Sequence, residues 1–396
     1  MRSYRRMLGL PGMRTLMILM LFARLPASAA GMVLTLHVAV GMKRGYGAAG
    51  LVGGVATVGI ALGAPVMGRV VDRYGLRPML VLTTVGEAAF WLTARHMSYP
   101  VLLACAFAGG FLVLPAMSIG RQAIAALVPV DLRRTAYSLD SVSVELTYMV
   151  GPAMAVLLAT QVSTGVATIG VGGTVVAAGV ALFVVNPRVR AAHEQAHGSE
   201  RIPRREWLTA RMVGVYAVGA GAVFVLAGTD VTMVAALRAA DQLDWTGAVV
   251  AVICVASAAG GLVHGAVQRS LPQVTLMALL GLLVIPVGLF AGQWWMLALA
   301  LVPSSAMCAP TVAATGEEVS RLAPPSMRGE ATGLQSSAFT LGAATGSPLV
   351  GFVVDHSSAA WGFAVAGIGG VLVAGAAWAL GAGRTARTPI SAGSPS

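Results

Sequence analysis

The sequence has few charged residues: Asp, Glu, Lys and Arg make up 10% of its 396 residues, whereas hydrophobic residues make up 57%. This balance excludes an ordinary soluble domain, in which about 25% of residues are charged. Cysteine is also scarce. Cys105, Cys254 and Cys308 fall inside apolar runs without the spacing of a disulfide framework or a metal site, so we expect buried free thiols.

Residues that support catalysis or nucleotide-driven transport are missing as well. The sequence has no Gly-Lys-Ser/Thr phosphate-binding loop, which argues against ATP as an energy source. No nucleophile paired with a base and no cluster of metal ligands stands out. We therefore expect no enzyme activity, no cofactor and no metal.

What the sequence does have is apolar runs of about 20 residues, long enough to cross roughly 30 Å of hydrocarbon as helices. They predict an all-α polytopic membrane protein with twelve transmembrane helices in two six-helix halves. The predicted spans are 15–40, 47–68, 78–95, 100–126, 134–159, 165–186, 210–237, 246–268, 272–291, 293–319, 329–354 and 359–382.

The formal charge of +11 would suggest a nucleic-acid partner in a soluble protein, but its distribution indicates a membrane. With the amino terminus inside, 21 of the 26 basic residues fall in inner segments, four in outer segments and one, Arg24, within a span. This positive-inside bias predicts that both termini are cytoplasmic. Arg24 also interrupts the first apolar run, so we do not expect a cleaved signal peptide.

A polar stretch at 187–209 separates six predicted spans from six. Self-similarity supports the division: at an offset of 195 residues, eight positions between 127 and 151 are identical, among them Arg133 with Arg328 and Gly151 with Gly346. Such a repeat is typical of transporters built from two similar halves. We predict an amino-terminal half at 1–186, a cytoplasmic linker at 187–209, and a carboxy-terminal half at 210–396 that ends in a short cytoplasmic tail.

A group of charged residues at 68–78 interrupts the apolar runs. Gly68 would let another helix approach closely and Gly75 would allow a left-handed turn. Asp72 is an anion suited to a helix amino terminus. These residues could form a contact between the two halves, although the neighbouring arginines could instead serve only to set the topology.

The pattern of Gly68, Asp72, Arg73, Gly75 and Arg77 resembles the loop between the second and third helices of the major facilitator superfamily. The resemblance covers the whole chain through the twelve spans and the repeat. It implies that Asp72 meets the amino-terminal end of the eleventh span, near 329–332, when the cytoplasmic side is shut. It also implies that Arg73 and Arg77 engage nearby acids or lipid phosphates.

The fifth predicted span carries Gly151 and Pro152, which resemble the helix-breaking motif of the bacterial drug/proton antiporters in that superfamily. Gly346 and Pro348 form a related pair in the eleventh span. Small residues beside a proline favour close packing and a local kink. We expect both pairs to be packing hinges between the halves.

Ionisable side chains at mid-membrane depth are functional hypotheses, because burying their charge is costly. Arg24, Glu87 and Glu145 lie about 9 to 11 residues into their spans, near the membrane centre at 1.5 Å per residue. We expect Arg24 to pair with one acid and the other acid to hold an exchangeable proton. Glu145 is the preferred carrier, Glu87 and Asp230 are further coupling candidates, and a permanent structural pair of Arg24 and Glu145 is the alternative.

The resemblance implies that the first, fourth, seventh and tenth spans line the substrate path, and these supply methionine and aromatic side chains with few hydrogen-bonding groups. We therefore expect proton-coupled efflux of small amphiphilic or drug-like compounds by a monomer in the cell inner (plasma) membrane, with the small molecule, protons and the lipid bilayer as partners and no nucleic acid. One alternative is a carrier that exports or imports a specific metabolite. The other is a membrane sensor or scaffold that transports nothing.

Overall fold

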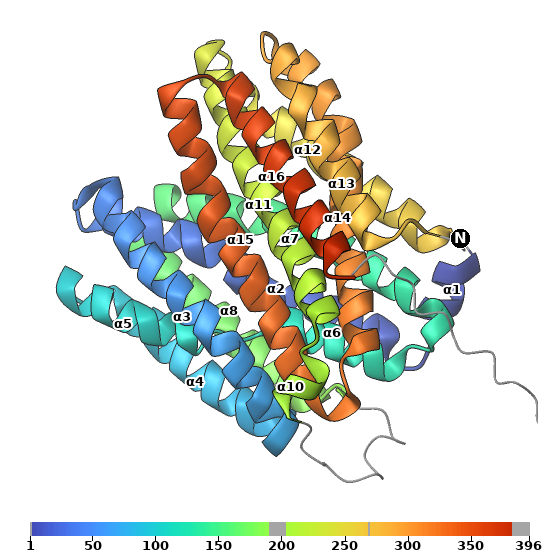
Figure 1. Ribbon diagram of the computed structural model, residues 1–396. Coiled ribbons are helices and arrows are strands. Elements are labelled where there is room, and N and C mark those ends of the chain that lie inside the picture. The colour runs from blue at the N-terminus through green and yellow to red at the C-terminus, as the bar shows by residue number, and fades with distance from the viewer. Residues whose placement is uncertain (1, 190–202, 268–269, 382–396) are drawn as a thin grey trace, which may run out of the picture.

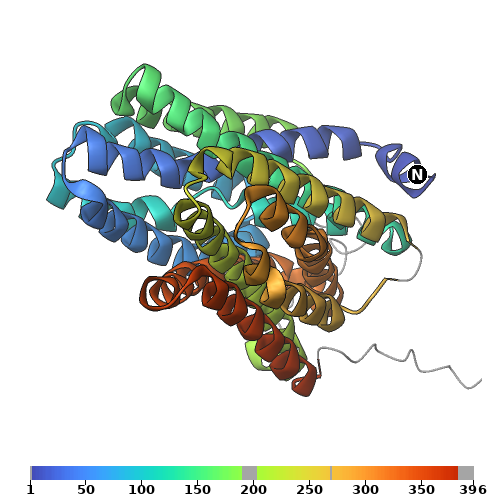
Figure 2. The ribbon, with the colours of Figure 1, turned by 90° about the horizontal axis from the view of Figure 1, so that it is seen from above.

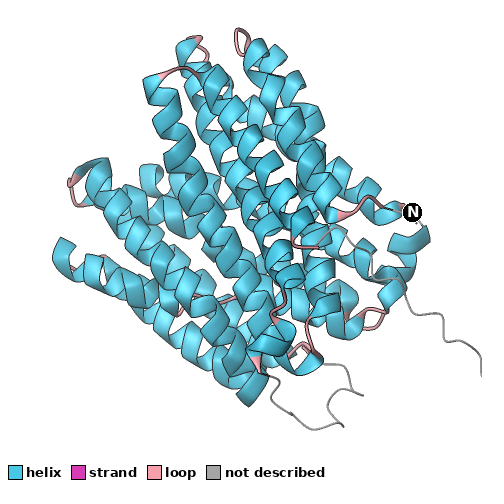
Figure 3. Cartoon of the chain, viewed as in Figure 1, coloured by secondary structure: helices cyan, strands magenta, loops and turns pink. Residues whose placement is uncertain are grey.

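The computed structural model describes residues 2–189, 203–267 and 270–381, and within them the chain is helical with no strand. Figure 3 shows long helices joined by short loops. The helices are α1 (Arg2–Leu8), α2 (Met13–Leu36) with its π-helical extension η1 (His37–Gly41), α3 (Gly45–Tyr74), α4 (Leu76–Ala94), α5 (Tyr99–Phe111), α6 (Ala116–Leu127), α7 (Val130–Gln161), α8 (Thr164–Val185), α10 (Arg204–Trp207), α11 (Ala210–Ala239), η2 (Leu243–Trp245), α12 (Thr246–Ala266), α13 (Gln273–Val284), η3 (Ile285–Phe290), α14 (Trp294–Leu322), η4 (Pro325–Met327), α15 (Arg328–His356) and α16 (Ala359–Ala379).

Eleven of the predicted spans are confirmed, in the described residues, as helices long and apolar enough to cross a membrane. The exception is α4, a helix of 19 residues that packs against α8 and α3. Arg77 and Glu87 lower the hydropathy of this helix. The length and composition of α4 alone therefore do not identify it as a span.

The charged segment at 68–78 is helical almost throughout, and the prediction of a loop there is wrong. Gly68 and Asp72 lie in the last turns of α3, and Arg77 lies in the first turn of α4. The helices are separated by Gly75 alone, whose φ of 86° lies in the region that favours glycine. Asp72 is consequently held by a rigid helix end.

The helices pack as two groups, α2 to α8 and α11 to α16. Two hydrophobic cores lie within the first group, apart from Met7 of α1 and Ala313 of α14, which join one of them. Two more lie within the second group, one of which includes Trp207 of α10. Figure 2 shows the blue-to-green helices beside the yellow-to-red ones. The groups meet chiefly where α3 packs on α15 and α7 packs on α12.

The segments that flank the linker, at 189 and 203, lie at one end of the bundle, which we call the linker end (Figure 1). The two groups of helices are closest near the linker end and diverge toward the opposite end (Figure 1). The interface between the groups is therefore tightest at the end that holds Asp72.

The glycine–proline pairs pack differently from expectation. Gly151 lies against Ser28 in α2, and Gly346 lies against Phe224 in α11. Each glycine thus contacts a helix of its own group, so the expected contact between the halves is wrong for both. Pro152 and Pro348 sit inside α7 and α15, which continue past them as helices.

Candidate functional site

The carboxylate of Asp72 caps the first turn of α15, where the resemblance placed it. The Gly329 N–H donates to Asp72 Oδ1 (2.9 Å) and the Glu330 N–H donates to Oδ2 (2.8 Å). The free N–H groups at a helix start carry partial positive charge and favour such an anion. Gly68 makes the contact possible because its backbone lies directly against Gly329, where a side chain would not fit. We call this the α3–α15 contact.

Glu330 extends the α3–α15 contact by binding two arginines. Its carboxylate accepts from Arg69 of α3 (3.0 Å) and from Arg204 of α10, and the Glu330 side chain is buried. α10 follows the linker, so one acid joins both groups of helices to the segment that connects them. The sequence analysis missed Glu330 and Arg69. Glu330 could have been found, because it is an acid in the first turn of α15, next to the helix end that Asp72 was expected to contact.

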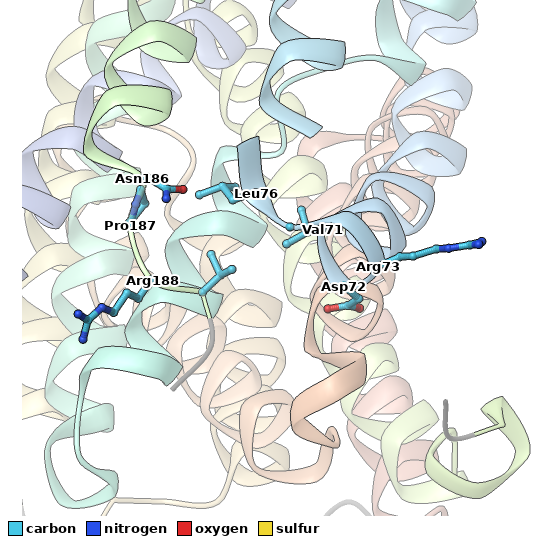
Figure 4. Close-up of a pocket in the computed structure, with 9 residues that line it drawn as sticks. Val71, Asp72, Arg73, Leu76, Asn186, Pro187 and Arg188 are labelled. Atoms are coloured by element: carbon cyan, nitrogen blue, oxygen red, sulfur yellow. The ribbon is translucent and has the colours of Figure 1, made fainter. Parts of the chain in front are cut away.

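Arg73 and Arg77 do not engage acids among the ion pairs of the described residues. Arg73 lies over the ring of Tyr74 (4.9 Å) and Arg77 lies over Phe183 (5.1 Å). Figure 4 shows the Arg73 side chain pointing away from Asn186, Pro187 and Arg188, the labelled pocket residues that follow α8. The pocket has a volume of about 280 Å³ between the α3–α4 turn and residues 186–189. A lipid partner for these arginines stays a prediction.

A second contact at the linker end joins α7 to α12 without a carboxylate cap. The Thr135 hydroxyl donates to the Gly265 carbonyl (2.7 Å), and Arg134 donates to the Val267 carbonyl (3.4 Å). The Tyr4 hydroxyl of α1 donates to the Leu262 carbonyl (2.9 Å). Burial raises the pKa of Tyr4 to about 12, so it remains a donor at neutral pH. We call this the α7–α12 contact.

The buried arginine of α2 has a different partner from the one expected. Arg24 Nη2 lies 2.7 Å from Asp140 Oδ1, and both side chains are about 3% exposed or less. The expected pairing of Arg24 with Glu145 or Glu87 is therefore wrong. Asp140 lies on the side of α7 that faces α2. The position of a residue along its helix gives its depth in the membrane but not the direction in which its side chain points.

Glu145 instead bridges the two groups of helices. The Ser257 hydroxyl of α12 donates to Glu145 Oε1 (2.9 Å), and the Cys308 thiol of α14 approaches the same oxygen (3.7 Å). Asp230 of α11 is exposed and lies close enough for its charge to interact with that of Glu145. Two carboxyl groups from opposite groups of helices therefore share one region of the interface.

Glu87 has a local structural role in α4. Its Oε2 accepts from the backbone N–H of Leu114 (2.7 Å), in the break between α5 and α6. The side chain is 2% exposed. Glu87 thus satisfies a donor that a broken helix leaves free, and it lies within the first group, away from the interface that holds Glu145.

Comparisons with known proteins agree with this arrangement. The family model described as the Major Facilitator Superfamily matches residues 16–290 and 247–395. The proton:xylose symporter XylE, solved with 6-bromo-6-deoxy-D-glucose, has a similar structure with a TM-score of 0.70 at 15% identity, over 93% of this chain and 95% of that one. A bacterial homologue of the iron transporter ferroportin in an outward-facing state has a TM-score of 0.71 at 14% identity, over 93% and 99%. No curated protein sequence matches the chain.

Proposed function

Because this chain belongs to the Major Facilitator Superfamily, we propose that it is a proton-coupled antiporter of the bacterial drug-efflux-like branch, exporting small amphiphilic compounds by alternating access. The family points to a transporter rather than an enzyme. In this proposal α4 is the twelfth span, residues 1–186 and 210–396 form halves of six helices, and 187–209 is a cytoplasmic linker. The linker end and both termini then face the cytoplasm of a monomer in the cell inner membrane.

The observation that carries the proposal is the position of Glu145 across the interface between the halves. Its hydrogen bonds come from α12 and α14, which lie on the far side of that interface. Alternating access moves the halves relative to each other. Glu145 would lose Ser257 and Cys308 in that movement, so its environment would differ between the two states, as a coupling acid requires.

The nearness of Asp230 to Glu145 gives a reason for the pair of acids to hold one proton. Two carboxylates that interact across a poorly hydrated interface disfavour double ionisation, so the pair tends to retain a proton. Asp230 has the more accessible side chain of the two and Glu145 is half-buried, so in this proposal the proton reaches water through Asp230. We propose Glu145 as the carrier and Asp230 as its exchange partner, with Arg24 acting through Asp140 and Glu87 playing no part.

The state of the molecule supports the assignment of the linker end as a closed gate. The α3–α15 and α7–α12 contacts are both formed at that end. One structural neighbour is named as outward-facing, and the other is named as a proton symporter. Both names are consistent with proton-driven transport through an outward-facing form of this fold.

An amphiphilic cargo is favoured by the surroundings of the acids. Near Glu145 lie Tyr148, Cys254 and Cys308, together with Ser257. A sugar would need many more hydrogen-bonding partners than these residues offer, because an unpaired buried hydroxyl is costly. A compound with an apolar body and one charged or polar group fits better.

Proton release on binding tests the proposal. The probes are three naphthalene derivatives that differ in one group: 1-naphthoate, 1-naphthamide and 1-naphthylmethylammonium. Binding of at least one probe in detergent should release protons from the wild type and not from Glu145→Gln, in which an amide replaces the acid. Glu87→Gln is the matched control and should release as the wild type does, because the amide oxygen can still accept from Leu114.

The outcomes separate the alternatives. Equal release from wild type and Glu145→Gln would move the carrier to Asp230 and contradict the proposed role of Glu145. Binding of a single metabolite without binding of any probe would favour a specific carrier. No transport of any compound in vesicles would favour a sensor.

A further inference from the structure

A second buried charge cluster lies closer to the linker end and contains more cations than anions. Arg24 of α2 binds Asp140 of α7, and Arg121 of α6 lies near both, so that its charge interacts with theirs. Arg24 and Arg121 are each 3% exposed and Asp140 is 1% exposed. Two guanidinium groups thus share one carboxylate, which leaves an excess of one positive charge.

The donors of this cluster are incompletely used. Nε and Nη1 of Arg24 are buried without a hydrogen-bond partner, and the ion pairs of the described residues include none for Arg121. Buried guanidinium groups normally form hydrogen bonds with most of their five N–H donors, because a buried donor without a hydrogen bond is costly. A permanent structural pair would need only one arginine beside Asp140.

Arg121 lies where the two halves meet. Its guanidinium sits 4.9 Å above the ring of Phe339 in α15, beside Gly316 of α14. One turn earlier in α6, Ser118 hydrogen-bonds Ser336 of α15 (3.1 Å). The second half therefore covers Arg121 in this closed arrangement, and separation of α15 from α6 would remove the cover.

We propose that Arg121 and Arg24 form the recognition site for an anionic group, a carboxylate, on the transported compound. The compound reaches the site from the linker end when the α3–α15 contact opens and Phe339 leaves Arg121. Its carboxylate takes the free guanidinium donors, for which the planar fork of arginine is well matched. The excess positive charge is then neutralised.

This inference rests on the proposed function and deepens it by naming the cargo class as amphiphilic carboxylates. Export of an anion also runs with an inside-negative membrane potential. Arg121 is the residue that determines specificity, because it meets the interface directly. Arg24 stands behind it and holds Asp140, which would otherwise neutralise Arg121 and compete with the cargo.

The test compares the binding of 1-naphthoate, 1-naphthamide and 1-naphthylmethylammonium to purified full-length protein by calorimetry. Wild type and Asp72→Asn are both used, the second to populate the form that is open at the linker end. Naphthoate should bind about tenfold or more tightly than naphthamide, as expected for one charge-assisted interaction. The preference should be larger in Asp72→Asn.

Arg121→Gln should abolish the preference for naphthoate while leaving the binding of naphthamide unchanged. Arg121→Lys should retain part of it, because charge is kept and the fork is lost; this variant also separates recognition from a purely structural role. Arg77→Gln removes an exposed arginine that lies over Phe183 and serves as the matched control. It should keep the full preference.

Equal affinity for naphthoate and naphthamide in both backgrounds would overturn the inference, as would a preference that survives in Arg121→Gln. If Arg121→Gln does not fold, the probe comparison in wild type and Arg121→Lys decides. Failure of the two proposals can be distinguished. Proton release without a preference for naphthoate overturns the anion site alone, and a naphthoate preference without proton release overturns proton coupling alone.

Discussion

The two contacts that close the linker end occupy related places in the two halves but use opposite chemistry. In the α3–α15 contact, a carboxylate on one helix end accepts from the N–H groups that begin the other helix. In the α7–α12 contact, side-chain donors of α7 reach carbonyl groups at the end of α12. At the repeat offset of 195 residues, Asp72 falls on Val267, which has no charge to offer.

This difference indicates that the gate is held unequally. A charged acceptor at a helix amino terminus combines two charge-assisted hydrogen bonds with the helix dipole. In the α7–α12 contact the Thr135 and Tyr4 hydroxyls give neutral bonds, which are individually weaker, and the charged donor, Arg134, is at the longer distance of 3.4 Å. The repeat preserves the geometry of the closure, and Asp72 gives the α3–α15 contact a charged helix cap that the α7–α12 contact lacks. We expect α3–α15 to limit opening, and α7–α12 to follow.

Gly68→Ala should have the largest effect. A methyl group at Gly68 would lie 3.0 Å from the Glu330 nitrogen and closer still to the Gly329 carbonyl, both backbone atoms that cannot move aside. We expect destabilisation of the closed form by about 3 kcal/mol, measured as increased reactivity of cysteines introduced at the interface. Gly261→Ala is the matched control in α12, where the nearest atoms belong to the side chains of Ala309 and Val142. Equal effects of the two changes would contradict the comparison.

Asp72→Asn should shift the population toward the open form by about 2 kcal/mol, or roughly 30-fold, because the amide keeps one acceptor and loses the charge. Distances between spin labels at the linker ends of α3 and α15 measure the shift. Unchanged distances in a folded variant would show that Asp72 does not hold the gate.

Thr135→Val removes the corresponding bond of the α7–α12 contact at nearly constant volume. We expect the closed form to lose about 1 kcal/mol of stability relative to the open form, a shift of roughly fivefold, because one neutral hydrogen bond is lost. The same labels placed on α7 and α12 provide the measurement. An effect greater than that of Asp72→Asn would reverse the proposed order of the two contacts.

Glu330→Gln should have the smallest effect, destabilising the closed form by about 0.5 kcal/mol relative to the open form. The backbone N–H that binds Asp72 is retained, and the lost partners, Arg69 and Arg204, are about half exposed. The effect should shrink further as salt concentration rises. A loss as large as that of Asp72→Asn would make Glu330 the principal element of the contact.

Much of the fold could be predicted because membrane helices are encoded by long apolar runs. The runs predicted eleven helices that the structure identifies as spans. The residue types of Gly68 and Asp72 allowed a contact between the halves, and the family resemblance implied that Asp72 meets the start of α15. The exact break at Gly75 was missed because arginine and aspartate are compatible with a helix end as well as with a loop.

The partners of buried charges could not be predicted in the same way. Depth along each helix brought Arg24 and Glu145 to similar levels, but rotation about the helix axes decides which side chains meet. Asp140 was not expected as the partner of Arg24, because no local pattern shows that its side chain faces α2. The approach of Asp230 to Glu145 depends on the packing of the two halves, which no local pattern encodes.

The most direct test of proton-coupled transport is flux driven by an imposed pH gradient in proteoliposomes. With the three naphthalene probes, wild type should move at least one of them against its gradient when the pH difference is applied, and should stop when the difference is collapsed. Glu145→Gln should exchange the probe passively without responding to pH. Transport by wild type that is indifferent to the pH gradient, or pH-driven transport that persists in Glu145→Gln, would contradict the account.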